Sequence, residues 1–370
     1  MTFASPVVLN AVSLKRLSIQ GYEEVVEVRH DGAGLHAFIA IHDRTLGPAF
    51  GGCRMMPYQT TPAALSDALL LSAAMTRKSA LADLPFGGGK CVVIGEPARQ
   101  KSDALLLRLA EAIDRLGGRY LTADDVGTSV RDMEVMRRVT PHARGLPDAA
   151  GEPCPAAAYG TFLSLLAAAR LRFGVTDLSG VTVAVQGLGS LGFRLCRYLR
   201  DAGAQLLVSD IRPEAVEMAR AAFDAVSVPP DRILSAAADI LSPNALGGVL
   251  TSRSIADVKA PLIVGGANNQ LQEKRLAQAL HERAVLFVPD YVANAGGVID
   301  VALEGPGYSA ERVLKACGRI ADTTLLILAR ASRKGRPPLE VAEALVRERL
   351  VQGAARQDRS TIGEEHAAWH

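Results

Sequence analysis

The chain has 370 residues, which at roughly 150 residues per domain predicts two domains. Hydrophobic residues make up 49% and charged residues 22%, a globular composition that excludes a disordered or collagen-like chain. Its 41 basic and 39 acidic residues leave a net charge of +2, and the absence of a long basic run argues against nucleic acid or a membrane surface as partner. A small molecule is the expected partner.

No apolar stretch reaches the ~18 to 20 residues that a membrane span requires. The N-terminal sequence MTFASPVVLNAVSLKRL lacks the order of a secretory signal, a basic segment followed by an apolar one, so a cytoplasmic protein is expected. The five cysteines are scattered and form no CxxC pair, and the histidines show no ligand spacing. Neither a disulfide framework nor a metal site is predicted.

The first half of the chain has the pattern of strands followed by helices. Strands are predicted over 24–30 and 35–43, before a glycine-rich turn at Gly47, Gly51 and Gly52. The next predicted elements are a helix from a cap at Thr61 to about Lys78, a glycine loop over 87–89, a strand over 91–94, a helix over 102–116 and a strand over 119–123.

Residues 140–155 hold four prolines and two glycines and are the predicted interdomain linker. Helices and strands alternate after it, which predicts a parallel sheet. The predicted elements are helices over 156–171, 191–201 and 214–223, strands over 181–186, 205–210, 262–265 and 285–288, and two final helices over 310–333 and 338–351 before a frayed polar tail.

A glycine motif in the second half follows the apolar strand VTVAV and opens a helix. The motif is Gly187, Leu188, Gly189, Ser190, Leu191 and Gly192. The first glycine permits a tight turn, the second lets a pyrophosphate approach, the third lets helix and strand pack closely, and the helix N-terminus attracts phosphate. This arrangement predicts a doubly wound, Rossmann-type NAD-binding domain, with an ordinary βα turn as the alternative.

Asp210 ends the next predicted strand and is expected to accept hydrogen bonds from the adenosine ribose. Its charge would repel a 2′-phosphate, which favours NAD over NADP as the cofactor. Ile211 is expected beside the cofactor. Arg212 weakens the preference because it could turn toward a phosphate, although an exposed arginine that heads a helix is the commoner case.

Three features of the first half are not explained by ordinary core building: Lys78 near a helix end, Lys90 directly after three glycines, and Asp124-Asp125 at a strand end. Together they indicate a polar pocket. Consecutive glycines cost chain entropy, so backbone or ligand is expected to come close to them. A flexible surface loop with a solvated lysine explains the spacing equally well.

The sequence resembles the leucine, valine and phenylalanine dehydrogenases of the amino-acid dehydrogenase superfamily over nearly its whole length. The similar segments are LGPAFGGCRM (46–55), MTRKSALADLPFGGGK (75–90), TADDVGT (122–128), VQGLGSLG (185–192), GGANNQL (265–271) and PDYVANAGGVI (289–299). The resemblance implies reversible oxidative deamination of an L-amino acid to the 2-oxo acid and ammonia, with reduction of NAD. It also implies a homo-oligomer.

The resemblance further implies the domain plan. An α/β substrate and oligomerisation domain is expected over 1–145, the Rossmann domain over 146–330, and C-terminal helices over 331–370 that return toward the first domain. A cleft between the two main domains would hold the reactants away from water.

Site residues follow from the resemblance. Lys90 would be the general base that activates water, Lys78 would hold the substrate carboxylate, and Asp125 would assist proton transfer. Two ammonium groups in a partly dry cleft disfavour each other's charge, so one lysine can lose its proton near neutral pH. Further expected substrate contacts are Gly51, Gly52, Phe50, Ala123, Asn269 and Val292, and expected cofactor contacts are Asn268 and Asn294.

The choice of amino acid depends on a few positions. In the family, the residue at Ala123 tends to be alanine for aliphatic substrates and glycine for aromatic ones, a bias of about 1–3 kcal/mol. The bulky side chain of Phe50 would narrow the substrate site further, unless Phe50 only packs in the core. Ala293 favours an aromatic substrate instead, because aliphatic-specific members of the family often carry a larger residue there. Leucine or valine is predicted. Phenylalanine or tryptophan is the alternative within the family, and a non-catalytic NAD-binding protein is the alternative from another class.

Overall fold

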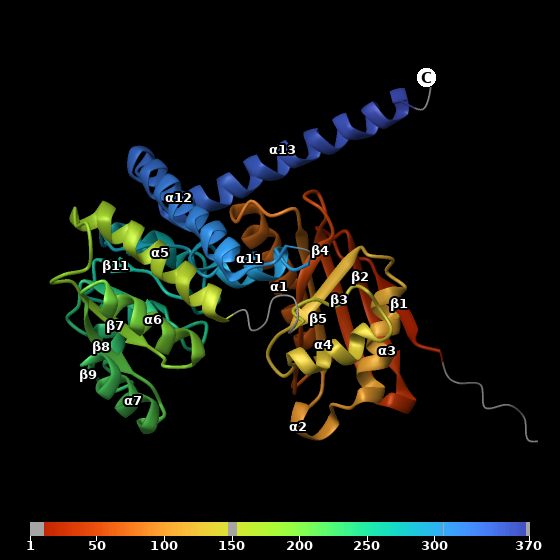
Figure 1. Ribbon diagram of the computed structural model, residues 1–370, viewed down its shortest axis with the longest axis horizontal. Helices are drawn as coiled ribbons and strands as arrows, with labels where there is room; N and C mark the ends of the chain where they lie inside the picture. The colour runs from red at the N-terminus through yellow and green to blue at the C-terminus, as the bar shows by residue number, and fades with distance from the viewer. Residues whose placement is uncertain (1–10, 147–153, 306, 368–370) are drawn as a thin grey trace, which may run out of the picture. The chain divides into compact units, whose positions relative to one another are not determined.

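The computed structural model describes residues 11–146, 154–305 and 307–367. The chain forms two compact units, one made of Met1–Ser79, Pro85–Gly151 and Arg356–His370 and the other of Ala80–Leu84 and Glu152–Ala355 (Figure 1). Each unit has its own six-stranded sheet with helices, which confirms the predicted α/β class. Part of the predicted linker, residues 147–153, lies outside the described residues.

The sheet of the first unit is mixed. Its strands lie in the order β1-β2-β3-β5-β4-β6, antiparallel from β1 to β5 and parallel from β5 to β6. The strands are β1 (Ser13–Leu17), β2 (Glu24–His30), β3 (Leu35–Asp43), β4 (Ala49–Met56), β5 (Gly87–Ile94) and β6 (Tyr120–Asp124). The helices are η1 (Asp31–Ala33), α1 (Thr61–Leu81), α2 (Pro97–Gln100), α3 (Asp103–Asp114) and α4 (Val130–Arg137).

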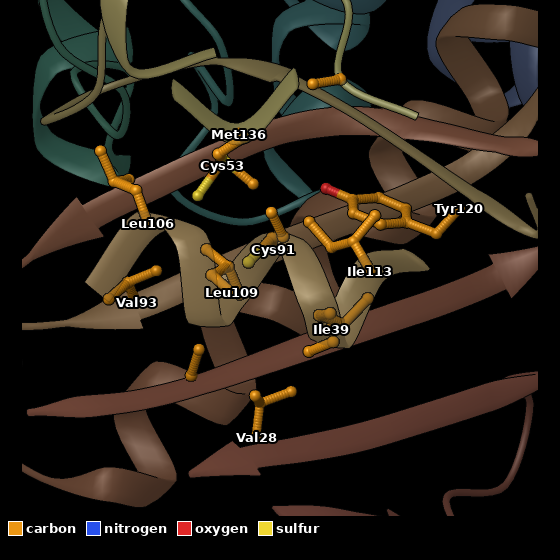
Figure 2. Packing of buried hydrophobic residues seen from close by; sticks show 14 of the residues in the cluster. Val28, Ile39, Cys53, Cys91, Val93, Leu106, Leu109, Ile113, Tyr120 and Met136 are labelled. Atoms are coloured by element: carbon orange, nitrogen blue, oxygen red, sulfur yellow. The ribbon is translucent and has the colours of Figure 1, made fainter. Parts of the chain in front are cut away.

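Alternate side chains of these strands build a separate core on each face of the sheet. One face is covered by the apolar sides of α3 and α4. Figure 2 shows the buried residues of this core, among them Ile39, Cys91, Leu109, Tyr120 and Met136. On the other face, α1 packs through Ala64 and Ala68 against Phe38 and Val92. The candidate site described below lies on this second face, which α1 covers.

The structure corrects the expectation of glycine loops in the first half. Residues 87–89 lie inside β5, and Gly51 and Gly52 lie inside β4 rather than in a turn. A Cβ added to Gly88 would lie 2.2 Å from the backbone nitrogen of Thr76 on α1. The missing side chain therefore lets the helix approach the strand, so the surface-loop reading of 87–89 is wrong.

Helix α1 differs from the prediction at both ends. Thr60, one residue before the predicted cap, accepts a hydrogen bond at Oγ1 from the backbone nitrogen of Ala63 (3.3 Å). The helix continues to Leu81, where Arg349 Nη1 donates to the carbonyls of Ala80 and Leu81 (2.6 and 2.7 Å) within the second unit. A basic side chain at the last carbonyls stabilises a helix end, and local sequence cannot reveal such a distant partner.

The sheet of the second unit is parallel throughout, as predicted. Its strand order, β12-β11-β10-β7-β8-β9, is that of a Rossmann domain. The strands are β7 (Thr182–Gln186), β8 (Gln205–Ser209), β9 (Val226–Ser227), β10 (Ile240–Pro243), β11 (Leu262–Ile263) and β12 (Leu286–Phe287). The helices are α5 (Cys154–Phe173), α6 (Ser190–Asp201), α7 (Pro213–Phe223), η2 (Ile233–Ser235), α8 (Ser252–Asp257), α9 (Leu276–Glu282), α10 (Asp290–Ala293), α11 (Gly296–Ala302), α12 (Ala310–Lys334) and α13 (Pro338–Ala367).

The last helix, α13, is longer than the predicted helix over 338–351 and takes the place of the frayed tail. No proline follows Pro338, so nothing in the covalent chain forces the helix to stop. Within the described residues, no helix is both long and apolar enough to cross a membrane.

Candidate active site

Lys90 lies in the interior of the first sheet, on β5 between β3 and β4. The next residue, Cys91, belongs to the core under α3 and α4. Because side chains alternate along a strand, Lys90 leaves the sheet on the opposite face, which α1 covers. Only 7% of its side chain is exposed. A cation with so little contact to water requires a compensating partner.

Asp125, directly after β6, is that partner: Lys90 Nζ and the Asp125 carboxylate form an ion pair. Burial raises the pKa of Asp125. The charges of Lys90 and Arg54 and a hydrogen bond from Val126 outweigh this effect and lower the pKa to about 2. The carboxylate is therefore ionised across the neutral range. So acidic a group is a weak base, better suited to orienting the lysine than to holding a proton.

The turn after β6 fixes the Asp125 carboxylate in place. Thr128 Oγ1 accepts a hydrogen bond from the nitrogen of Asp125 (2.9 Å) and donates to the carbonyl of Cys53 on β4 (2.7 Å). Gly127 has a φ of +81°, and a Cβ there would lie 1.8 Å from the carbonyl oxygen of Met55. Glycine alone suits this backbone and this space. The TADDVGT segment thus ties Asp125 to the neighbouring strand.

Arg54, which no sequence pattern singled out, belongs to the same cluster. Its Nε lies 3.6 Å from Asp125 Oδ2 and its Nη1 lies 3.1 Å from Asp67 Oδ2, which also accepts a hydrogen bond from the Tyr58 hydroxyl (2.5 Å). Burial lowers the pKa of Arg54, and the neighbouring carboxylates raise it by more. Its position two residues after Gly52 on β4 is the signal that could have placed it on this face.

Three of the predicted substrate residues share the face of Lys90. Gly52 pairs with Ala123 of β6, and Phe50 precedes Gly52 by two positions on β4. Phe50 and Ala123 are each only 4% exposed. The ring of Phe50 lies 5.5 Å from the ring of Phe86, so Phe50 takes part in core packing as well. Two buried apolar side chains, Phe50 and Ala123, therefore lie on the face of Lys90.

The paired glycines of β4 make room for protein atoms. A Cβ on Gly51 would lie 1.8 Å from the carbonyl oxygen of Gly89 on β5, and a Cβ on Gly52 would lie 2.8 Å from the Cβ of Asp125. The neighbouring strand and the Asp125 turn therefore require glycine at both positions, and the predicted approach of substrate to Gly51 and Gly52 stays a prediction.

Lys78 is half-buried on α1, the helix that covers the face of Lys90. The contacts beside it fix the helix on β5: Thr76 meets Gly88, and Ser79 Oγ donates to the carbonyl of Gly87 (3.4 Å). These contacts hold the backbone on both sides of Lys78 against the strand that carries Lys90. Its role toward the substrate carboxylate stays a prediction.

In the second unit, the glycine motif joins β7 to α6. Gly187 has a φ of +91°, and its nitrogen donates to the carbonyl of Ser209 (2.7 Å). The nitrogen of Leu188 donates to Asp210 Oδ2 (2.7 Å), so the acid after β8 helps to fix the loop. A Cβ on Gly192 would lie 1.9 Å from the carbonyl oxygen of Gly187. The expected tight turn and close helix packing are both present.

The loop is open at Gly189. Nothing lies within 4 Å of a Cβ built on Gly189, the N-cap of α6. Ser190 begins this 12-residue helix, whose free N–H groups and positive dipole end attract phosphate. The side chain of Leu191 packs against Gly266. A Cβ added to Gly266 would lie 2.6 Å from Leu191 Cδ2. Its backbone, not its side chain, is the part that can contact a phosphate.

Asn294 and Asn268 lie together in the second unit. Asn294 is 6% exposed, and its Nδ2 donates to Asn268 Oδ1 (2.8 Å) and to the carbonyl of Gly266 (3.1 Å). Within the described part of the chain, the buried Oδ1 of Asn294 has no hydrogen-bond partner. An orphaned acceptor of this kind is costly unless a donor arrives. The carboxamide N–H of a nicotinamide is a donor that fits it.

The remaining predicted residues of this unit differ in exposure. Ile211 is 88% exposed directly after Asp210, where it can meet an adenine ring. Val292 is 2% exposed on the short helix α10. Asn269 has a φ of +52°, and its nitrogen donates to Asp290 Oδ2 (2.5 Å), so a turn accounts for its conformation. Substrate contacts of Asn269 and Val292 stay predictions.

Asp300, on α11, is a buried carboxyl that no sequence motif indicated. It is 3% exposed, and the Tyr308 hydroxyl donates to its Oδ1 (2.9 Å). Burial raises the pKa of Asp300, the Tyr308 hydrogen bond lowers it, and the charge of Glu304 raises it, with a net value of about 6. The folded protein thus favours the neutral acid.

The stability of the protein should consequently depend on Asp300 and on pH. Its carboxyl titrates near 3.8 when unfolded and near 6 when folded, so the stability that the neutral acid provides is lost as the pH rises through 6. We expect Asp300→Asn to raise the free energy of unfolding by about 1–3 kcal/mol at pH 8 and to change it little at pH 4. Thermal unfolding at both pH values tests this, with Asp231→Asn, whose side chain is 77% exposed, as the control. An equal gain at both pH values, or none at pH 8, contradicts it.

A Rossmann unit with an open nucleotide loop, in one chain with a buried lysine–aspartate pair suited to proton transfer, defines a nucleotide-dependent dehydrogenase. The chain belongs to the glutamate, leucine, phenylalanine and valine dehydrogenase family. Residues 22–142 match the family's model described as "Glu/Leu/Phe/Val dehydrogenase, dimerisation domain", and residues 208–311 match "Glutamate/Leucine/Phenylalanine/Valine dehydrogenase". The family that six sequence segments indicated is confirmed.

Curated relatives carry three different substrate names. The chain is 44% identical to a leucine dehydrogenase of Bacillus subtilis over 89% of this chain and 91% of that one. It is 42% identical to an L-tryptophan dehydrogenase of Nostoc punctiforme, over 89% and 94% of the two chains. It is 40% identical to a valine dehydrogenase of Streptomyces virginiae, again over 89% and 94%.

Solved structures support the same class. The crystal structure of L-tryptophan dehydrogenase from Nostoc punctiforme matches with a TM-score of 0.79 and 40% identity, covering 90% of this chain and 96% of that one. A hetero-hexameric glutamate dehydrogenase from Thermus thermophilus matches with a TM-score of 0.73 and 25% identity, covering 94% and 89%. The protein is therefore a pyridine-nucleotide-dependent amino-acid dehydrogenase of the leucine, phenylalanine, valine or tryptophan type, as predicted at the level of enzyme class.

Proposed function

We propose that this enzyme catalyses the reversible, NAD-dependent oxidative deamination of a branched-chain aliphatic L-amino acid, leucine or valine, to the 2-oxo acid and ammonia. The observation that carries the proposal is the buried Lys90–Asp125 pair on the sheet face that also bears Phe50 and Ala123. This face combines a group for proton transfer with two buried apolar side chains. The relatives named leucine and valine dehydrogenases support the choice of substrate.

The overall reaction converts the amino acid, oxidised cofactor and water into the 2-oxo acid, ammonium and reduced cofactor, with release of one proton. The bound nicotinamide supplies the redox chemistry by accepting the α-hydrogen with its electron pair. The imine left on the substrate then adds water at its α-carbon, and a base takes a proton from that water. The carbon–nitrogen bond breaks, ammonia leaves, and the carbonyl of the 2-oxo acid forms.

Lys90 is the proposed base for the attacking water. The ionised Asp125 carboxylate accepts a hydrogen bond from the Nζ of Lys90 and holds the amine in position, while the guanidinium of Arg54 lies beside the same carboxylate oxygen. Lys78 is the proposed partner of the substrate carboxylate, since an ammonium group forms a charge-assisted hydrogen bond with it. Two lysines near one substrate disfavour each other's charge, which helps one of them to act as a base.

NAD is the proposed cofactor, bound through the loop after β7. The pyrophosphate would accept hydrogen bonds from the backbone nitrogens of Ser190 and Leu191 at the start of α6. Asp210 would accept one from an adenosine ribose hydroxyl. A carboxylate has about four acceptor positions, and four donors from Leu188 and Arg212 already contact Asp210, so the ribose hydroxyl would replace one of the side-chain hydrogen bonds from Arg212.

At the other end of the cofactor, the nicotinamide carboxamide is the proposed donor for the orphaned Oδ1 of Asn294, with Asn268 holding the opposite side of that amide. The proposal leaves Asn269 and Val292 as candidate substrate contacts.

An aromatic substrate is the second candidate, favoured by the likeness to the L-tryptophan dehydrogenase and by the small side chain of Ala293. Against it, the ring of Phe50 is held beside Phe86 and lies on the same face as Ala123. A larger side chain would have to displace Phe50 from that packing. We therefore place leucine and valine first.

We also propose a homo-oligomer, because residues 22–142 match a family domain described as a dimerisation domain. A mass from light scattering near a multiple of 39.0 kDa supports this proposal, and a mass of 39.0 kDa contradicts it.

A substrate panel tests the proposed activity. With NAD and single L-amino acids, we expect NADH formation with leucine or valine at a kcat/KM at least about tenfold above that for phenylalanine or tryptophan, a difference of about 1.4 kcal/mol. One ammonia should appear for each NADH, and D-leucine serves as the control. A preference for an aromatic amino acid contradicts the substrate, and NADH formation from no L-amino acid contradicts the activity.

A further inference from the structure

A second cation lies beside the carboxylate that pairs with Lys90. Asp125 Oδ2, the oxygen that contacts the Lys90 amine, also lies 3.6 Å from Nε of Arg54. The other oxygen of the carboxylate, Oδ1, accepts a hydrogen bond from the backbone nitrogen of Val126 (2.7 Å). One oxygen is therefore held by the main chain, and two cationic side chains share the other.

The Nε group of Arg54 is buried and, within the described residues, has no hydrogen-bond partner. At 3.6 Å from Asp125 Oδ2 it forms an ion pair but lies beyond hydrogen-bond distance. A buried donor without an acceptor is unfavourable. This donor is satisfied when the carboxylate forms its hydrogen bond with Arg54 instead of with the amine of Lys90, so the carboxylate has an alternative partner.

The guanidinium of Arg54 is fixed by a carboxylate on α1. Its Nη1 donates to Asp67 Oδ2 (3.1 Å), which also accepts a hydrogen bond from the hydroxyl of Tyr58 (2.5 Å). Only 19% of the Arg54 side chain is exposed. A guanidinium group stays protonated in proteins. Arg54 is thus a permanent cation between two carboxylates, whereas Lys90 can change its charge.

The charge balance of this cluster changes when Lys90 acts as a base. Its ammonium form must first release one proton to solvent, which leaves a neutral amine. A carboxylate beside the amine opposes this step, because it favours the charged form. With Arg54 beside it, the Asp125 carboxylate still has a cation after the proton has left. The step therefore leaves no buried charge without a partner, which would be costly.

We infer that Arg54 is a positioning residue for the proposed base: it becomes the main partner of the Asp125 carboxylate when Lys90 is neutral, and so favours release of the lysine proton. The inference rests on the proposed function, in which Lys90 takes a proton from the attacking water. Asp67 limits the effect, because it shares the charge of Arg54. Arg54 itself contacts neither the water nor the substrate in this scheme.

The elements packed around Lys90 carry several other charged or titratable groups. They are His42 on β3, Tyr58 after β4, Asp67, Arg77 and Lys78 on α1, and Asp124 at the end of β6. Burial lowers the pKa of His42, so its ring is neutral at the alkaline pH at which a lysine releases its proton. A cation at Lys78 acts on Lys90 in the same sense as Arg54. The test therefore leaves Lys78 unchanged.

Titration of the Lys90 amine in the full-length protein tests the inference without turnover. The chain has eight lysines, so labelling with [ε-13C]lysine gives few NMR signals, and the signal missing from Lys90→Arg identifies Lys90. In Arg54→Gln, the pH at which half of the Lys90 amines are neutral should rise by about one unit or more, because a charge within about 4–6 Å changes such a midpoint by about 1–3 units. In Asp67→Asn the midpoint should fall, because a negative charge is removed.

Two further variants control for the change of side chain. Arg54→Lys keeps the cation, so its midpoint should lie closer to that of the wild type than the midpoint of Arg54→Gln does. Arg108→Gln lies on α3, on the opposite face of the sheet, with 27% of its side chain exposed, and should leave the midpoint unchanged. The low-pH limb of kcat/KM for L-amino-acid oxidation should move with the midpoints, so that Arg54→Gln loses about tenfold at a fixed pH on that limb.

The opposite shifts of the two main variants separate this role from a purely structural one. An unchanged midpoint in Arg54→Gln, or shifts of Arg54→Gln and Asp67→Asn in the same direction, overturns the inference and leaves the proposed function standing. If Arg54→Gln does not fold, Asp67→Asn decides alone, and a midpoint that stays or rises overturns the inference. Shifts as expected in a protein that oxidises no L-amino acid support the assigned coupling of charges and contradict only the proposed activity.

Discussion

Lys90→Ala is expected to lower kcat for the proposed amino-acid oxidation by about 10³-fold or more, because general base catalysis typically contributes 10²–10⁴-fold and Lys90 also balances the charge of Asp125. Only 7% of the Lys90 side chain is exposed, and its amine is ion-paired with the Asp125 carboxylate. Without it, water that attacks the imine has no amine to take its proton. Stopped-flow and steady-state absorbance of the reduced nicotinamide measure the loss.

Two measurements separate this loss from unfolding. Asp125 keeps Arg54 as a second cation, so thermal unfolding of Lys90→Ala should still be cooperative. Binding of 5′-AMP should match the wild type within about twofold, because the nucleotide loop lies in the other unit. Lys259→Ala, at an exposed position, is the control and should retain full activity. A Lys90→Ala variant with more than a tenth of wild-type kcat refutes the assigned role.

Gly51→Ala is expected to destabilise the first unit by about 3 kcal/mol or more, at the upper end of what overpacking costs. The added Cβ would lie 1.8 Å from the carbonyl oxygen of Gly89 and 2.8 Å from its carbonyl carbon. These are backbone atoms of a paired strand, so neither can move without separating β4 from β5. Urea unfolding measures the change, and poor recovery of soluble protein is the extreme form of the same result.

Gly318→Ala is the matched control for this substitution. Gly318 lies within α12, and nothing lies within 4 Å of a Cβ built there, so the change should stabilise the protein by about 0.5–1 kcal/mol through helix propensity. If Gly51 were glycine because substrate approaches it, Gly51→Ala would leave the free energy of unfolding unchanged and raise KM. That outcome would support the approach of substrate, rather than packing of the sheet, as the reason for glycine at this position.

The features that sequence alone determined are local in the chain. The turn, helix start and close packing of the Gly187–Gly192 motif involve residues within one strand–loop–helix segment, and Asp210 follows at the end of the next strand. Such segments are specified by conformational preferences of neighbouring residues, which is why the parallel alternation and the Rossmann unit were predicted correctly. Strand 24–30 and strand 35–43 were predicted for the same reason, from their own hydrophobic pattern.

Only the tertiary structure decided what the first-half glycines do and which residues surround Lys90. Gly88 packs against Thr76 of α1, and Gly51 packs against Gly89 of β5. Arg54 forms an ion pair with Asp125, which lies 71 positions further along the chain. No local pattern distinguishes a glycine in a loop from one that admits a neighbouring helix or strand, because the neighbour comes from elsewhere in the sequence. The same reason explains the buried Asp300, because burial depends on contacts between elements, and these exist only once the chain has folded.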